Sequence, residues 1–175
     1  MKSLLSPVLS AGQCASCKFC CTFAAFEAWE TPLFSKDEVE YLTKKYGAFP
    51  VRKTGSNSYT LDLSGYWETH GEKEYAPCPF LDKEHGCILR EEEKPFDCKI
   101  WPLRIMRKEN EYVIALTPTC RELNKLPLEC IKQLVNDEDT ADIIFEEAEK
   151  MPDIIKEYRE GFPMLKEKAA APLNK

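Results

Sequence analysis

The stretch of sequence that decides how this chain folds is residues 14–21, which read CASCKFCC. Gaps of two residues separate Cys14, Cys17 and Cys20, and Cys21 follows at once. Such gaps let neighbouring sulfur atoms point at a common centre, and in a helical turn they place Cys17, Cys20 and Cys21 on one face. Thiolate is the group that soft metal ions select. The stretch therefore predicts a metal site built from sulfur ligands.

A second group of cysteines lies in residues 76–102, a segment that shows no sustained apolar period and contains four prolines. Periodic packing cannot hold such a segment, so something else must fix its shape. We expect its sulfur atoms to converge with those of residues 14–21. Cys130 stands apart, because its apolar helical surroundings favour a place in the core. The eight candidate metal ligands are Cys14, Cys17, Cys20, Cys21, Cys78, Cys87, Cys98 and Cys120.

The composition bounds the class of protein. The 175 residues carry 24 Lys and Arg against 30 Asp and Glu, a net charge of −6, which argues against nucleic acid as a partner. No apolar stretch approaches the length of a membrane span, so we expect no membrane partner. Ser6 and Pro7 interrupt the apolar N-terminal residues, so a secretory signal is not expected. We expect a cytoplasmic protein with reduced thiols, and the odd number of nine cysteines agrees with that.

Periodicity predicts an α+β fold with a small antiparallel sheet, an irregular cysteine-rich metal-binding region and a helical C-terminal cover. We expect a single domain, residues 1–175, with a metal-chelating core over 12–121, helices over 122–167 and a flexible tail over 168–175. The expected elements are a helix after the capping box at Ser35, ending at Gly47; a strand over 59–63; a hairpin formed by 103–107 and 111–116; and helices over 126–135, 141–148 and 152–158.

These motifs resemble the CxxCxxCC family of zinc- or iron-chelating domains, also called YkgJ-type. The resemblance covers roughly residues 12–121 and rests on the run 14–21, on CPFL at 78–81, on CIL at 87–89 and on KPFDCKIWP at 94–102. Two family arginines are Lys94 and Lys99 here, and lysine lacks the planar fork of arginine. Leu89 stands where the family usually has tyrosine. The resemblance implies metal chelation and leaves the metal and any reaction open.

The spacing of the cysteines favours an iron–sulfur cluster. A CxxCxxC run with a distant Cys-Pro is typical of bacterial [4Fe–4S] ligation, which here selects Cys14, Cys17, Cys20 and Cys78. Such a protein would transfer electrons or support a partner enzyme through a protein or redox partner that the sequence does not identify. The alternative is zinc in one or two four-cysteine sites of a structural or interaction module. A thiol redox protein is the lesser alternative.

A divalent core with four thiolates carries a charge of about −2, and a buried charge must be compensated. Basic residues near the candidate ligands would supply this compensation and hydrogen bonds to the cofactor. The run Glu91–Glu93, by contrast, is expected to form a solvated face. The predicted cofactor-binding cations are Lys18, Arg90, Lys94, Lys99 and Arg121, with Arg104 as a further candidate.

Overall fold

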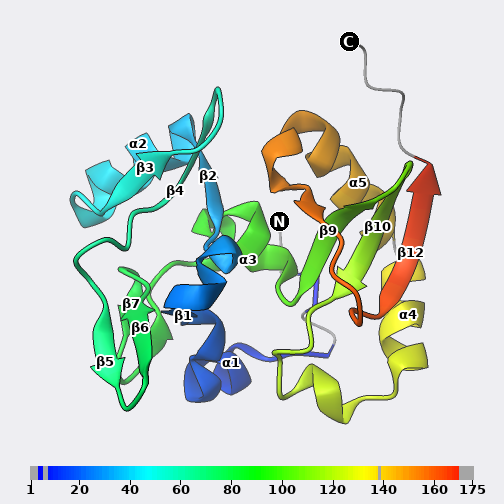
Figure 1. Ribbon diagram of the computed structural model, residues 1–175, viewed down its shortest axis with the longest axis horizontal. Coiled ribbons are helices and arrows are strands. Elements are labelled where there is room, and N and C mark those ends of the chain that lie inside the picture. Colours follow the sequence, from blue (N-terminus) through cyan, green and yellow to red (C-terminus); the bar gives the residue numbers. More distant parts are fainter. Residues whose placement is uncertain (1–3, 6–7, 138, 170–175) are drawn as a thin grey trace. The chain divides into compact units, whose positions relative to one another are not determined.

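The computed structural model describes residues 4–5, 8–137 and 139–169 (Figure 1). The chain divides into two compact units, residues 1–99 and 100–175. The boundary falls within helix α3 (Phe96–Ile100), well before the predicted division at residue 121. The fold class is α+β, as predicted. That the two units act as a single domain stays a prediction.

The first unit combines short helices with three small antiparallel sheets, ordered β1-β6-β5, β2-β4-β3 and β7-β8 (Figure 1). Besides α3, its helices and 3-10 turns are α1 (Ala11–Cys17), η1 (Phe19–Cys21), η2 (Ala25–Glu30), α2 (Lys36–Tyr46) and η3 (Glu91–Glu93). Its strands are β1 (Thr22–Ala24), β2 (Leu33–Ser35), β3 (Val51–Lys53), β4 (Ser58–Leu61), β5 (Glu68–His70), β6 (Lys73–Pro77), β7 (Leu81–Asp82) and β8 (Gly86–Cys87).

Helix α2 begins and ends where the sequence predicts. The Ser35 hydroxyl accepts a hydrogen bond from the Glu38 amide at 3.2 Å, and the Glu38 carboxylate accepts one from the Ser35 amide at 2.7 Å. This capping box satisfies two backbone donors that the first turn leaves without partners. Gly47 ends the helix with a φ of +92°, which a residue with a side chain rarely adopts.

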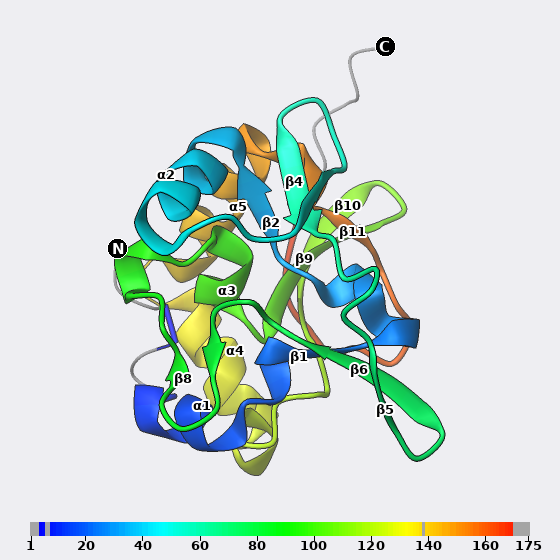
Figure 2. The ribbon, with the colours of Figure 1, turned by 90° about the vertical axis from the view of Figure 1, so that its left-hand side faces the viewer.

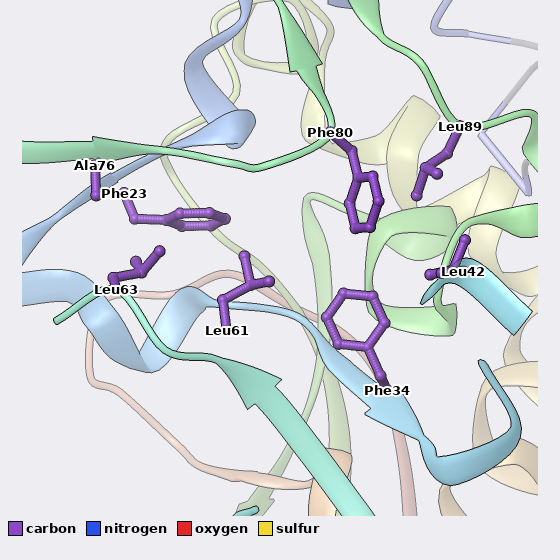
Figure 3. Packing of buried hydrophobic residues seen from close by; sticks show 8 residues of the cluster. All are labelled: Phe23, Phe34, Leu42, Leu61, Leu63, Ala76, Phe80 and Leu89. Carbon is purple, nitrogen blue, oxygen red and sulfur yellow. The ribbon is translucent and has the colours of Figure 1, made fainter. Parts of the chain in front are cut away.

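A cluster of buried apolar side chains holds the first unit together (Figure 3). The Phe80 ring packs edge-to-face on Phe49, with centroids 4.8 Å apart, and on Tyr46, at 6.0 Å. Phe80 and Leu89 flank the β7-β8 hairpin, so the core anchors both ends of the segment that carries Cys87. The cluster consists of Phe23, Phe34, Leu42, Leu61, Leu63, Ala76, Phe80 and Leu89.

The second unit is built on one four-stranded sheet, ordered β11-β9-β10-β12. The predicted hairpin is confirmed, and Glu109 turns it with a φ of +54°. The predicted apolar face over residues 141–148 is confirmed, because Ala141, Ile144, Phe145 and Ala148 are all buried. The elements are β9 (Leu103–Lys108), β10 (Glu111–Leu116), η4 (Leu123–Lys125), α4 (Leu128–Asn136), α5 (Thr140–Lys150), η5 (Pro152–Ile154), β11 (Lys156–Glu157) and β12 (Met164–Ala169).

Two predictions for the C-terminal region are wrong. Of residues 152–158 only 152–154 are helical, in the 3-10 turn η5; Lys156 and Glu157 form β11, which pairs with β9 in parallel. Lys168 and Ala169 belong to β12 and pair with β10 rather than to a tail. The cause is tertiary: each outer edge of the β9-β10 hairpin offers backbone donors and acceptors that a further strand can pair. Residues 170–175 of the predicted tail lie outside the described residues. Among the residues described, every helix is too short or too polar to cross a lipid bilayer.

Candidate metal centre

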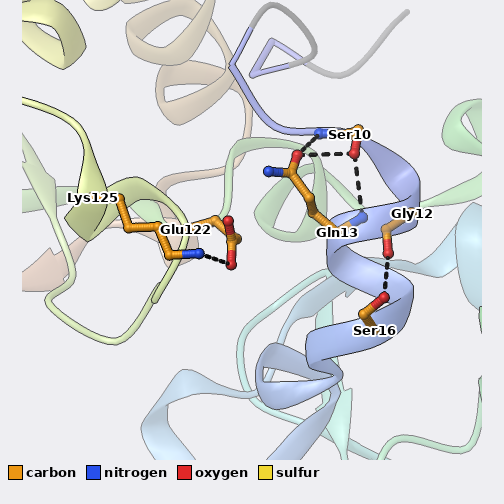
Figure 4. A network of polar contacts seen from close by, with 6 residues as sticks. All are labelled: Ser10, Gly12, Gln13, Ser16, Glu122 and Lys125. Atoms are coloured by element: carbon orange, nitrogen blue, oxygen red, sulfur yellow. Dashed lines mark hydrogen bonds and ion pairs between the residues drawn. The ribbon is translucent and has the colours of Figure 1, made fainter.

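Helix α1 carries the first two cysteines of the run. Its N-terminus is closed by a capping box in which the Ser10 hydroxyl accepts from the Gln13 amide at 3.2 Å and the Gln13 side chain accepts from the Ser10 amide at 2.8 Å (Figure 4). The helix ends at Cys17, because Lys18 adopts a left-handed φ of +54°. Cys14 and Cys17 therefore lie on a regular, capped helix.

The left-handed Lys18 also corrects a prediction. Cys17, Cys20 and Cys21 do not share one helical face, because Cys20 and Cys21 lie in the separate 3-10 turn η1. A hydrogen bond joins the Cys20 and Cys21 side chains. The run is thus two short pieces joined at Lys18.

Strand pairing brings the run to the second group of cysteines. Thr22 of β1 pairs with Pro77 of β6, and the Cys78 amide donates to the Cys21 carbonyl at 2.8 Å. Cys21 and Cys78 are therefore neighbours although they lie 57 positions apart in the sequence (78 − 21 = 57).

The β7-β8 hairpin places Cys87 near Cys78 and near the helix that carries Cys14 and Cys17. Cys87 pairs with Leu81, whose amide donates to the Cys78 carbonyl at 3.0 Å. Gly86, with a φ of +84°, lies so close to α1 that an added Cβ would stand 2.8 Å from the Ala15 Cα. Figure 2 shows α1 beside β8. Only glycine fits here, and it lets the helix that carries Cys14 and Cys17 pack against the strand that carries Cys87.

Cys98 is held in the same unit by a buried carboxylate. The neighbouring Asp97 is only 2% exposed, and its side chain accepts from the Leu33 amide of β2 at 3.0 Å. The Cys98 amide donates to the Pro95 carbonyl at 3.0 Å. These bonds fix the first turn of α3 and with it the position of Cys98.

Four of these thiols interact electrostatically in every pairing: Cys20, Cys78, Cys87 and Cys98. Burial, followed by the charges of Cys87 and Cys20, raises the pKa of Cys78 to about 12. Burial is also the main reason that the pKa values of Cys87 and Cys98 are raised. The pKa of Cys20 is raised first by its hydrogen bond to Cys21 and then by burial. All four therefore hold their protons at neutral pH unless a cation compensates the thiolates.

Cys87 and Cys98 nevertheless keep access to solvent. Burial by surrounding protein is still the largest cause of their raised pKa values, so their charged forms are disfavoured.

Proximity does not amount to a closed coordination sphere. Within the described parts of the chain, no three His, Cys, Asp or Glu side chains are close enough to hold one ion. No disulfide links any of the nine cysteines, all of which the structure describes. Cys120 lies in the second unit, so its role as a ligand stays a prediction. Cys130, also in that unit, is exposed, so its predicted place in the core is wrong.

Lys94 is the predicted cation that interacts with this set of thiols. Its ammonium group pairs with Glu91 and interacts with Cys20, Cys87 and Cys98. Burial lowers the pKa of Lys94, but Glu91 and the thiols outweigh burial and raise it overall. Lys94 thus stays protonated and can offset thiolate charge.

The other predicted cations have different surroundings. The Lys18 ammonium donates to the Lys83 carbonyl, and that of Lys99 donates to the Glu92 carbonyl at 3.4 Å. Arg90 is exposed. Arg104 and Arg121 lie in the second unit, where the Arg104 guanidinium stacks on Trp101 at 4.5 Å.

Two features of the site escaped the sequence analysis. Glu93 is buried, which contradicts the expected solvated face of residues 91–93. A pocket of about 480 Å³ opens beside Cys78, with Phe19, Tyr75 and Leu81 in its largely apolar lining. The available signal for the burial of Glu93 was the polar and aromatic side chains of α2. Periodicity shows that such side chains share a helix, but it does not show that they bind a carboxylate about 50 residues away.

Comparison of the chain with protein-family models, with curated proteins and with solved structures finds no match. The resemblance to the CxxCxxCC family therefore stays a prediction that rests on the motifs themselves.

Proposed function

We propose that the first unit is a metal-chelating domain that binds an iron–sulfur cluster through cysteine thiolates. The observation that carries this proposal is the backbone arrangement that brings cysteine-bearing segments together: the Cys78 amide donates to the Cys21 carbonyl at 2.8 Å, and Gly86, next to Cys87, packs against α1. The thiols of Cys20, Cys78, Cys87 and Cys98 also interact electrostatically. Thiol groups gather in this way at metal sites, where each releases its proton to solvent and binds the metal as a thiolate. Cys21, whose carbonyl accepts from the Cys78 amide, and Cys14 and Cys17, on the helix packed against Gly86, are further candidates.

The donor set suits a cluster. Four thiolates satisfy either a zinc ion or a [4Fe–4S] cluster. A cluster of four irons takes one thiolate at each iron, so it spreads its ligands over more space than a single ion does. Lys94 supplies a compensating positive charge, and hydrogen bonds and charges near the sulfur atoms tune a cluster.

The proposed ligands differ in part from the ferredoxin-like set. Both sets contain Cys20 and Cys78; the proposed set adds Cys87 and Cys98, whose thiols interact with those of Cys20 and Cys78, and the other set adds Cys14 and Cys17. Substitution separates the two assignments. Replacing Cys98 should harm the centre only if the proposed set is right, and replacing Cys14 only if the set Cys14, Cys17, Cys20 and Cys78 is right.

Bound there, a cluster would supply one-electron chemistry, and the chain's thiolates would hold it. We propose electron transfer, or support of a partner enzyme, in a reducing compartment such as the cytoplasm. The pocket beside Cys78 offers a partner a partly apolar surface next to the centre.

The test is iron and sulfide analysis of protein purified without oxygen, together with its visible absorption. We expect coloured protein with stoichiometric iron and acid-labile sulfide, lost in Cys78→Ser and retained in Cys130→Ser, a cysteine of the second unit. Colourless protein with stoichiometric zinc would replace the cluster with the zinc alternative. Protein without any bound metal would refute the proposal.

A further inference from the structure

Glu93 is a buried carboxylate with an unusually complete set of donors. Its side chain is 3% exposed and pairs with the Lys45 ammonium. It also accepts from the Tyr41 hydroxyl at 2.8 Å, the Tyr46 hydroxyl at 2.7 Å and the Arg90 amide at 3.0 Å. Lys45 and Tyr46 lower the pKa of Glu93 more than burial raises it, so the group is ionised at neutral pH.

The donors and the acceptor belong to different parts of the first unit. Three donors come from the last turns of α2, whereas Glu93 ends the turn η3 in the segment between Cys87 and Cys98. The backbone hydrogen bonds of that segment are mostly local, such as those from the Glu93 amide to the Arg90 carbonyl and from the Cys98 amide to the Pro95 carbonyl, so they do not tie it to α2. A charged group with four donors is a strong attachment in such a place, because charge-assisted hydrogen bonds are shorter and stronger than neutral ones.

The attachment acts on the residues that surround the thiols. Lys94 follows Glu93 directly and interacts with Cys20, Cys87 and Cys98. The Glu92 carbonyl accepts from Lys99, the residue after Cys98. Fixing Glu93 on α2 therefore fixes the position of Lys94 and restricts the movement of Cys98.

We propose that Glu93 is a positioning residue of the metal centre, which it serves by tying the segment that carries Lys94 and Cys98 to helix α2. This inference rests on the proposed function. Loss of the carboxylate charge leaves the partly buried Lys45 without its partner and loosens the segment. The thiolate at Cys98 and the ammonium of Lys94 then no longer hold their places, and the metal dissociates faster.

The experiment compares metal release from Glu93→Gln, Tyr46→Phe and the matched control Glu92→Gln. Glu92 is exposed and is the adjacent acid in the same turn, so its substitution changes the net charge equally. Each variant is loaded, and transfer of its metal to an excess of chelator is followed in time at a temperature where far-UV circular dichroism shows all of them folded. Substituting a partner outside the first coordination shell costs roughly 10–100-fold in metal affinity. We expect release about 10-fold faster or more in Glu93→Gln, a smaller acceleration in Tyr46→Phe and none in Glu92→Gln.

Release from Glu93→Gln at the rate of Glu92→Gln would overturn the inference. If Glu93→Gln does not fold, Tyr46→Phe provides the test, because it removes one hydrogen-bond donor to Glu93 and keeps the aromatic ring. Metal release from folded Tyr46→Phe at the wild-type rate would then overturn the inference. A wild-type protein that binds no metal would instead refute the proposed function itself, and the two failures are therefore distinguishable.

Discussion

The two units of this chain reach order by different means. The second unit rests on three strands of six residues each, β9, β10 and β12. Ile105 of β9 and Val113 and Ile114 of β10 are almost fully buried. In the first unit, by contrast, the segment 76–99 consists of two-residue strands, a 3-10 turn and part of a five-residue helix. Periodic packing explains the second unit. The first needs specific attachments: Phe80, Gly86, Asp97, Glu93 and, we propose, a metal.

Removal of the metal should produce the largest difference between the two units. Because structural metal sites contribute about 10–16 kcal/mol of apparent binding free energy in the smallest domains, we expect amides of residues 14–21 and 76–99 to lose much of their protection in the metal-free protein. Those of β9 and β10 should keep theirs. Hydrogen exchange with mass spectrometry, with and without metal, measures both regions at once. Equal loss in the two units would show that they do not differ in this respect.

Truncation of one core ring in each unit sharpens the comparison. Phe80→Ala and Phe145→Ala each remove a ring that is 3% exposed, so each should lower the free energy of unfolding by about 3–5 kcal/mol. Only Phe80→Ala should also weaken metal binding, because Phe80 lies two residues after Cys78. Urea unfolding and metal retention give the two readouts. Equal metal retention in the two variants would argue against the role of this core in holding the centre.

Two glycines test the close approach of helix α1 to the hairpin. Gly86 and Gly161 have similar positive φ values, +84° and +88°, but only Gly86 has a neighbour within 4 Å of an added Cβ. Gly161→Ala should cost about 1–2 kcal/mol for the backbone conformation alone. Gly86→Ala should lower the free energy of unfolding by more, since Ala15 must move. Thermal unfolding of both variants measures the difference. Equal losses would mean that α1 can shift away from residue 86 without a cost in stability.

The smallest expected effect concerns pH. The pKa of Glu93 is lowered by Lys45 and Tyr46 in the folded protein, so its contribution to stability is present above its unfolded value, about 4.3, and is lost as pH falls below that value. Glu93→Gln should therefore differ from wild type at pH 7 and approach it at pH 3. Urea unfolding at both pH values provides the measurement. If the difference in unfolding free energy between Glu93→Gln and wild type were larger at pH 3 than at pH 7, the expected direction of the pH dependence would be contradicted.

Local signals predicted much of this fold. The capping box at Ser35, the stop at Gly47 and the apolar spacing of residues 141–148 depend on residues a few positions apart, and all of them are confirmed. Strands β11 and β12 were missed because they exist only through pairing with β9 and β10. In β12, Leu165 alone is buried, so no alternation marked it as a strand.

The candidate site divides in the same way. Spacing selected the cysteines as candidate ligands, and that role stays a prediction; the structure makes Cys21 and Cys78 neighbours and packs α1, with Cys14 and Cys17, against β8, with Cys87. Spacing could not show that Lys18 interrupts the run, that Gly86 admits α1, or that Glu93 turns inward to α2. Each of these depends on a partner distant in the sequence, which no single stretch of residues reveals.

X-ray absorption at the metal edge of protein purified without oxygen tests most directly whether cysteine thiolates hold a metal centre in the first unit. We predict an iron edge with a shell of sulfur ligands and iron–iron scattering, both weakened in Cys20→Ser and Cys98→Ser. A shell of nitrogen and oxygen ligands, or a spectrum unchanged by those substitutions, would contradict it.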